Sequence, residues 1–179
     1  MVEKLTPPAL ARKTVESYVS SNLKLDPIEF KVTDVDVEEA GVFVSIKLKN
    51  GDLRGCIGTI FPTQKTIEQE IITNAISAST QDPRFTPIGP DELGNLVFSV
   101  DVMQKPEQIN DVSELDPHKY GIIVKSDSGR QALLLPNLEG VDTVEHQVAI
   151  TKRKAGIPMN EPVHIFRFRA DRYYEEQKV

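Results

Sequence analysis

Apolar residues recur along the chain with two different spacings, which predict its secondary structure. A helical spacing over residues 7–21 follows Thr6 and a Pro-Pro pair, which is typical of a helix start. A second helical run over 63–80 is predicted to have Thr63 as its N-cap. A third, over 142–155, has acidic residues first and basic residues last, matching the helix dipole. The chain is therefore predicted to contain three long helices.

A strict alternation of apolar and polar positions predicts roughly seven strands. Residues 32–37 and 42–48 are expected to form a hairpin around a turn at 38–41. Gly51 then turns the chain into a third strand of the same meander. Further strands are predicted over 96–102, 120–126, 130–136 and 163–174. Most links are too short for parallel crossovers, so we expect an α+β fold, mainly antiparallel sheet flanked by helices.

The bulk composition is ordinary for a globular protein. The 179 residues are 39% hydrophobic and 27% charged, which predicts a single domain over residues 1–179. We find neither a signal-peptide pattern nor a run of about 20 apolar residues, so we expect a cytoplasmic protein without a membrane span. The net charge of -6 disfavours non-specific nucleic-acid binding, which needs clustered Lys and Arg.

The single cysteine, Cys56, lies in the stretch LRGCIGTI at 53–60. Strand alternation places Arg54 and Cys56 on one face with Cα atoms about 7 Å apart, a range at which a guanidinium favours the thiolate. Gly55 and Gly58 weaken the strand but permit close approach by a ligand or another backbone. These groups together could bind an anion and act on it. Alternatively, Cys56 is a small buried hydrophobe and Arg54 pairs with a carboxylate.

A second candidate is the tetrapeptide DPRF at 82–85. Asp82 can cap a turn and Pro83 stiffens it, so Arg84 would be held rigidly for carboxylate or phosphate recognition. Phe85 would anchor the loop in the core. The alternative is an Asp82–Arg84 pair that only fixes the loop.

The remaining chemistry predicts no metal and no cofactor. His118, His146 and His164 have no metal-motif spacing, and the chain lacks a P-loop and a dinucleotide fingerprint. His164 lies in an apolar strand and is predicted to be a core residue. The basic run at 152–154 is predicted to be a solvated helix end.

With DEL at 91–93, LLLP at 133–136 and KAGI at 154–157, these motifs resemble the AMMECR domain family. That family is named for the AMME-syndrome chromosomal region and is also called AmmeMemoRadiSam system protein A. The resemblance covers nearly the whole chain. It implies two unequal lobes around a cleft, with the motif strand nearby, and an association with Memo-like and radical SAM proteins. It implies no particular reaction.

The resemblance selects site residues position by position: Arg54, Gly55, Cys56, Ile57, Gly58, Asp82, Arg84, Phe85 and Glu92. The segment QALLLPN departs from the family's GLLLPQ at Ala132 and Asn137, so neither is given a role.

Three functions are therefore expected to compete. The first is a cytosolic enzyme acting on a small anionic substrate, with Cys56 as nucleophile or acid/base. Arg54 and Arg84 would hold the anion, and Glu92 would orient a partner group. The second is a non-catalytic ligand-binding or adaptor protein serving radical SAM and Memo-like partners. A nucleic-acid-binding factor is a third, which the acidic balance disfavours. Whether the protein is an enzyme stays open from its sequence.

Overall fold

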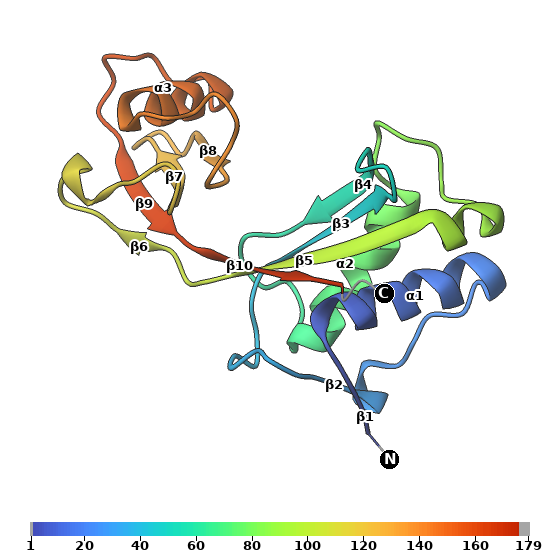
Figure 1. Cartoon of the computed structure of the whole chain (residues 1–179). Coiled ribbons are helices and arrows are strands. Elements are labelled where there is room, and N and C mark those ends of the chain that lie inside the picture. Colours follow the sequence, from blue (N-terminus) through green and yellow to red (C-terminus); the bar gives the residue numbers. More distant parts are fainter. Residues whose placement is uncertain (1, 176–179) are drawn as a thin grey trace. The chain divides into compact units, whose positions relative to one another are not determined.

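The computed structural model describes residues 2–175 and divides the chain into two compact units of unequal size (Figure 1). Unit 1 contains the chain up to Met103 and again from Asp171, and unit 2 is Gln104–Ala170. Both units combine helices with sheets. The β1-β2 pair is parallel, whereas β3 pairs with β4 and β5, β9 with β6 and β7, and β7 with β8, in antiparallel orientation. The prediction of an α+β fold is confirmed.

Unit 1 is built on a four-stranded sheet of order β10-β5-β3-β4, together with a small parallel pair, β1-β2. Its elements are β1 (Glu3–Leu5), α1 (Pro7–Ser21), η1 (Pro27–Glu29), β2 (Phe30–Val32), β3 (Val42–Leu48), β4 (Leu53–Gly58), α2 (Ile67–Thr80), η2 (Pro90–Asn95), β5 (Leu96–Met103) and β10 (Ala170–Tyr174).

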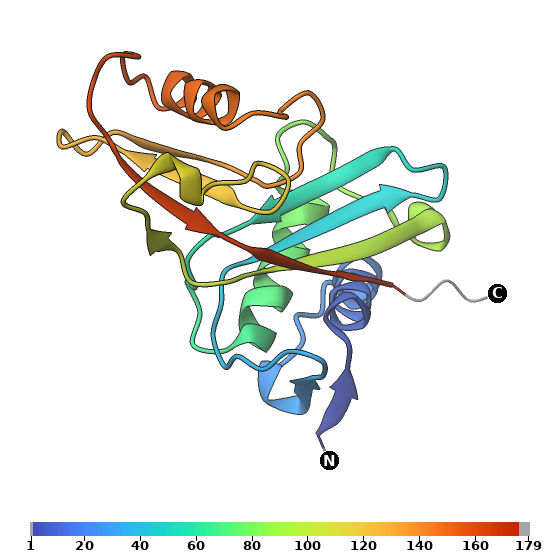
Figure 2. The same ribbon diagram turned by 60° about the vertical axis from the view of Figure 1, so that its left-hand side comes forward.

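Helices α1 and α2 lie side by side and pack on one face of this sheet (Figures 1 and 2). The alternation in β3 explains the arrangement, because Val42, Val44 and Ile46 are fully buried in the core that the helices share. The residues between them, such as Ser45, point to the opposite face. No helix in the described part of unit 1 packs on that second face.

The predicted hairpin of residues 32–37 with 42–48 is wrong. β2 instead pairs in parallel with β1, in a register that places Leu5 opposite Val32. Asp34 has a φ of 67°, which takes the chain out of the extended conformation just after β2. The apolar alternation therefore stops contributing to a strand before it reaches the predicted turn.

The predicted N-cap of the second helix is also wrong. Thr66, not Thr63, accepts the backbone N–H of Gln69 and caps α2. The buried carboxylate of Glu70 accepts the backbone N–H groups of Thr63 and Gln64, at 2.8 and 2.7 Å. These hydrogen bonds hold residues 63–64 against the side of α2, so this segment does not form the first turn of the helix.

Unit 2 is a four-stranded antiparallel sheet of order β6-β9-β7-β8 with one helix packed on β7 and β8. The strands predicted over 120–126 and 130–136 are confirmed and pair with each other, and the predicted last helix is confirmed. The elements are β6 (Glu107–Gln108), η3 (Val112–Glu114), β7 (Gly121–Lys125), β8 (Gln131–Leu134), α3 (Val144–Lys154) and β9 (His164–Phe168).

The closing strand predicted over 163–174 is two strands. β9 pairs with β7 and β6 in unit 2, whereas β10 pairs with β5 in unit 1. Continuous alternation hides this change of sheet, because both strands are half-buried ribbons with the same period. None of the helices within residues 2–175 has the length and apolarity of a membrane-crossing segment.

Candidate functional site

The LRGCIG motif forms β4, the edge strand of the unit 1 sheet. Its first glycine is required by helix packing: a Cβ on Gly55 would stand 2.2 Å from the carbonyl oxygen of Ala78 in α2. A Cβ on Gly58 would stand 2.3 Å from Cγ of Phe43 on β3. Both contacts are far shorter than van der Waals separation. The two glycines therefore let β4 pack closely against its own fold, and this accounts for them without a ligand.

Cys56 lies on the face of the sheet opposite the helices. In the strand register Ser45 is directly opposite Cys56 on one side and opposite Ser99 on the other. The three side chains thus form a row across β4, β3 and β5. The Cys56 Sγ lies 3.2 Å from the Ser45 Oγ, and Cys56 is half-buried. The row places one thiol and two hydroxyls side by side.

The outer edge of β4 is closed by the DPRF loop. The Cys56 N–H donates to Asp82 Oδ2 at 2.9 Å, and the Arg84 Nη2 donates to the Cys56 carbonyl oxygen at 3.5 Å. The Asp82 and Arg84 side chains therefore occupy the place where a neighbouring strand would lie.

Asp82 is buried and accepts four hydrogen bonds in total. Arg84 donates to it from Nε and Nη2, at 3.0 and 2.7 Å, and from its backbone N–H at 3.1 Å. The Arg84 guanidinium, followed by the backbone N–H groups of Cys56 and Arg84, holds the pKa of Asp82 far below its usual range, although burial opposes this. The carboxylate is ionised, so the pair is a fixed part of the strand edge.

Arg54 is paired in the same way with Glu92. Its Nε and Nη2 donate to the two Glu92 oxygens at 2.7 and 2.8 Å, and its Nη1 donates to the Thr86 carbonyl at 2.9 Å. The Arg54 hydrogen bonds lower the pKa of Glu92, assisted by the Gly89 N–H that also donates to it. All three guanidinium nitrogens of Arg54 are therefore used inside the protein.

The Phe85 ring lies beside both guanidinium groups, 5.9 Å from the Arg54 Cζ and 5.5 Å from the Arg84 Cζ. The two arginines nevertheless differ in exposure. The Arg54 side chain is 12% exposed, whereas that of Arg84 is 55% exposed. Arg84 Nη1 makes no hydrogen bond to any residue within 2–175. Of the two, Arg84 has the more exposed side chain and a guanidinium nitrogen that has no partner among the described residues.

The predicted site residues thus lie together around β4. They are held there by the ion pairs that the sequence analysis gave as the structural alternative to an anion site. Arg54 does pair with a carboxylate, and Asp82 with Arg84 does fix the loop. Sequence reasoning missed Ser45 and Ser99. The signal was present, because each is a small polar residue at the outward position of an otherwise apolar alternation.

The prediction that His164 is a core residue is wrong, because its side chain is 54% exposed and its Nε2 lies 3.0 Å from Asp127 Oδ1. The sequence predicted a core position for His164 only because the neighbouring residues of its strand are apolar. No group of three metal-ligating side chains lies together within residues 2–175.

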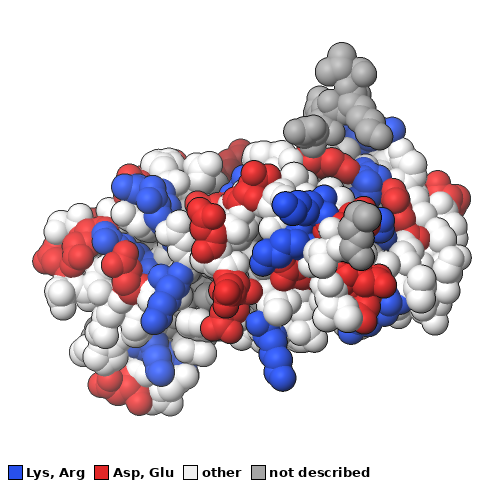
Figure 3. All heavy atoms as spheres, turned by 90° about the horizontal axis from the view of Figure 1, so that it is seen from below, with Lys and Arg blue, Asp and Glu red and all other residues white. Residues whose placement is uncertain are grey.

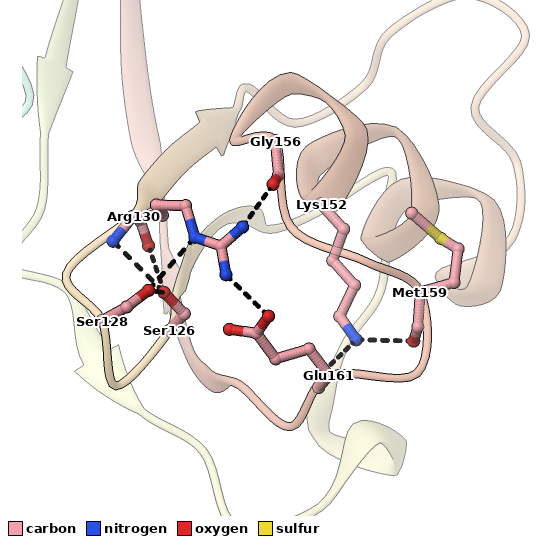
Figure 4. Close-up of polar contacts among 7 residues, drawn as sticks. All are labelled: Ser126, Ser128, Arg130, Lys152, Gly156, Met159 and Glu161. Carbon is pink, nitrogen blue, oxygen red and sulfur yellow. Dashed lines mark hydrogen bonds and ion pairs between the residues drawn. The ribbon is translucent and has the colours of Figure 1, made fainter.

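Lys152 is not a solvated helix end. It is buried, and its ammonium donates to the carbonyl oxygens of Met159 and Glu161 at 2.9 and 2.6 Å (Figure 4). Arg130 reinforces this segment through the Glu161 carboxylate at 2.7 Å and the Gly156 carbonyl at 2.6 Å. The basic side chain therefore anchors the loop that follows α3.

The class defined by these features is an α+β protein with its motif residues on one sheet edge, and comparison with known proteins places it further. The AMMECR1 family model matches residues 8–173, so the chain belongs to the AMMECR1 family. A Thermotoga maritima protein is 48% identical over 164 residues, covering 91% of this chain and 94% of that protein. A Clostridium acetobutylicum protein is also 48% identical, over 93% of this chain but only 35% of that protein.

The fold also resembles that of a solved structure. The crystal structure of an uncharacterised protein from Pyrococcus horikoshii aligns with a TM-score of 0.79 and 30% identity. The alignment covers 95% of this chain and 90% of that chain.

Proposed function

We propose that the protein acts on a small anionic substrate, with Arg84 as the anion-binding cation and Cys56 as the reactive group. The observation that carries the proposal is the Arg84 Nη1, which has no hydrogen-bond partner within residues 2–175 and belongs to a half-exposed side chain that also contacts the backbone of Cys56. An anion held by this nitrogen adds a charge-assisted hydrogen bond without disturbing the Asp82 pair.

The other motif residues have supporting roles in this proposal. Asp82 fixes both Arg84 and the Cys56 N–H, and Glu92 fixes Arg54 against the strand. Glu92 is thus a positioning residue, not an acid or base. Gly55 and Gly58 set the position of β4. Ser45 and Ser99 extend the site across the sheet and supply hydroxyl groups for a polar substrate.

A second candidate is a non-catalytic ligand-binding or adaptor protein. The observation that favours it is that both arginines already have carboxylate partners, so the motif is largely satisfied internally. Radical SAM and Memo-like proteins are the partners that the family resemblance implies. We place the protein in the cytoplasm, and we do not assign it to nucleic acid. On the face in Figure 3, basic and acidic side chains are interspersed, with no continuous basic surface.

Alkylation of Cys56 in the presence of inorganic phosphate tests the proposal. Iodoacetamide should label Cys56 of the native chain at pH 7 faster than Cys56 of the urea-unfolded chain, because a reactive thiol depends on its folded surroundings. Phosphate should slow the labelling and raise the melting temperature through mass action, relative to chloride at matched ionic strength.

Arg84→Ala should abolish both phosphate effects, whereas Arg153→Ala, on an exposed arginine of α3, should keep both. A native thiol that is slower than the unfolded one and is not protected by phosphate would overturn the catalytic proposal. Phosphate stabilisation that depends on Arg84, with an inert thiol, would instead select the non-catalytic function.

A further inference from the structure

Unit 2 contains a pocket of about 360 Å³ that is separate from the motif residues. It lies where β6 ends and β9 begins, and its walls come from 108–112 and 163–165. Its volume falls within the range of small-molecule sites. The pocket exists because an antiparallel ladder opens there.

The ladder opens at one residue pair. The Ile109 N–H donates to the Ile165 carbonyl at 3.0 Å, so the next hydrogen-bonded pair in this register would be Asp111 with Val163. The Asp111 N–H instead donates to Glu114 Oε1 at 3.1 Å, as part of the capping box of η3. The turn therefore takes Asp111 away from β9.

Val163 stays in the position from which it would pair with Asp111. Its N–H and C=O point toward the β6 side, as those of Ile165 do, because alternate residues of a strand face the same neighbour. Neither group makes a hydrogen bond to any residue within 2–175. Val163 is half-buried. The pocket thus presents one donor and one acceptor side by side.

The surrounding walls suit a flat, neutral molecule. Val112 is 53% exposed and offers an apolar surface. The His164 ring is held at both nitrogens, by Gln108 at 3.4 Å and Asp127 at 3.0 Å. Asp111 in the wall is acidic, as is Asp127 behind His164, and both disfavour an anion. No Lys or Arg lines the pocket.

We infer that this pocket binds a small neutral ring compound whose N–H and C=O are adjacent, as in a lactam or a nucleobase edge. The compound pairs with the C=O and N–H of Val163 and so replaces the missing Asp111. Its ring lies against Val112. This site is independent of the proposed function at Cys56.

Two-dimensional NMR of the full chain tests the inference with uracil, hypoxanthine and 2-pyrrolidone as probes. Each should give saturable shifts at the amides of Ile109, Val163 and Ile165 at millimolar concentration. The analogue 1,3-dimethyluracil, which has no N–H, should give none.

Two variants locate the effect. Val163→Pro removes the donor and no hydrogen bond of the fold, and Val112→Trp fills the pocket from an exposed position; both should abolish the shifts at Ile109 and Ile165. Val37→Trp, at a similarly exposed valine of unit 1, should retain them. Absence of shifts with all three probes, equal shifts with the dimethyl analogue, or shifts that survive Val112→Trp would overturn the inference.

Discussion

The two units differ in the hydrogen bonding of their open strand edges. In unit 1 the edge strand β4 has its Cys56 N–H bound by Asp82 and its Cys56 carbonyl approached by Arg84. In unit 2 the equivalent groups of Val163 have no partner among the described residues. An edge satisfied by side chains is fixed in one geometry, whereas an unsatisfied edge beside a pocket is available to a ligand. The comparison separates residues that build the fold from groups that remain for binding.

The largest effect is expected where β4 contacts its helix. Gly55→Ala places a methyl group 2.2 Å from the backbone carbonyl of Ala78, so α2 must move. We expect a loss of about 3 kcal/mol in the free energy of unfolding. Gly94→Ala is the matched control, because nothing lies within 4 Å of its Cβ, and it should change stability by about 0.5 kcal/mol or less. Urea denaturation measures both, and equal effects would contradict the packing account of the motif.

A pair of proline substitutions tests the two edges directly. Cys56→Pro removes the N–H that Asp82 accepts and leaves a buried carboxylate short of a donor, so it should cost about 2–3 kcal/mol. Val163→Pro removes an N–H that has no partner, and prolines are tolerated at such edges. It should change the midpoint of urea denaturation far less.

Amide hydrogen exchange gives the same comparison without substitution. The Cys56 amide should be protected and the Val163 amide should exchange rapidly. Similar protection at both positions would contradict the contrast between the edges.

The sequence predicted the elements of both units better than their pairing. Periodicity located α1, β5 and α3, because each carries a local signal. It failed for β2, whose partner β1 lies far away in sequence, and for the strand over 163–174, which changes sheets. Pairing depends on distant segments, and alternation has the same period in either sheet.

The site was predicted as a set of residues more successfully than as a mechanism. Motif residues Arg54 and Arg84 do lie near Cys56, but their carboxylate partners Glu92 and Asp82 decide what they can do. Those partners are 38 and 2 residues away, and no spacing rule distinguishes a satisfied arginine from a free one. The opening at Val163 was not predicted from the sequence. It arises because the Asp111 N–H donates to Glu114 and not to Val163.

Acid should loosen the closed edge of unit 1. Because Asp82 has a lowered pKa in the folded state, its ionisation stabilises the fold above the unfolded-state pKa of about 3.9. That contribution is lost as the pH falls from about 4 toward the folded pKa. Asp82→Asn, which keeps an oxygen for the Cys56 N–H but does not titrate, should lose less stability between pH 5 and pH 3 than the wild type, by urea denaturation at each pH. An identical acid response would show that Asp82 does not govern it.

A small effect on stability is expected from changing the side chain of Cys56. Its side chain is half-buried with its sulfur 3.2 Å from the Ser45 hydroxyl, so a serine hydroxyl there would find a hydrogen-bond partner. Cys56→Ser and Cys56→Ala should each therefore cost about 1 kcal/mol or less. The closed edge depends on the backbone of Cys56, which both variants keep. If the thiol serves a site, both variants lose function in the cell while their urea midpoints stay near that of the wild type. A serine variant much less stable than the alanine variant would instead show that Cys56 is a packed core residue, and the significance of the motif would then rest on Arg54 and its two glycines.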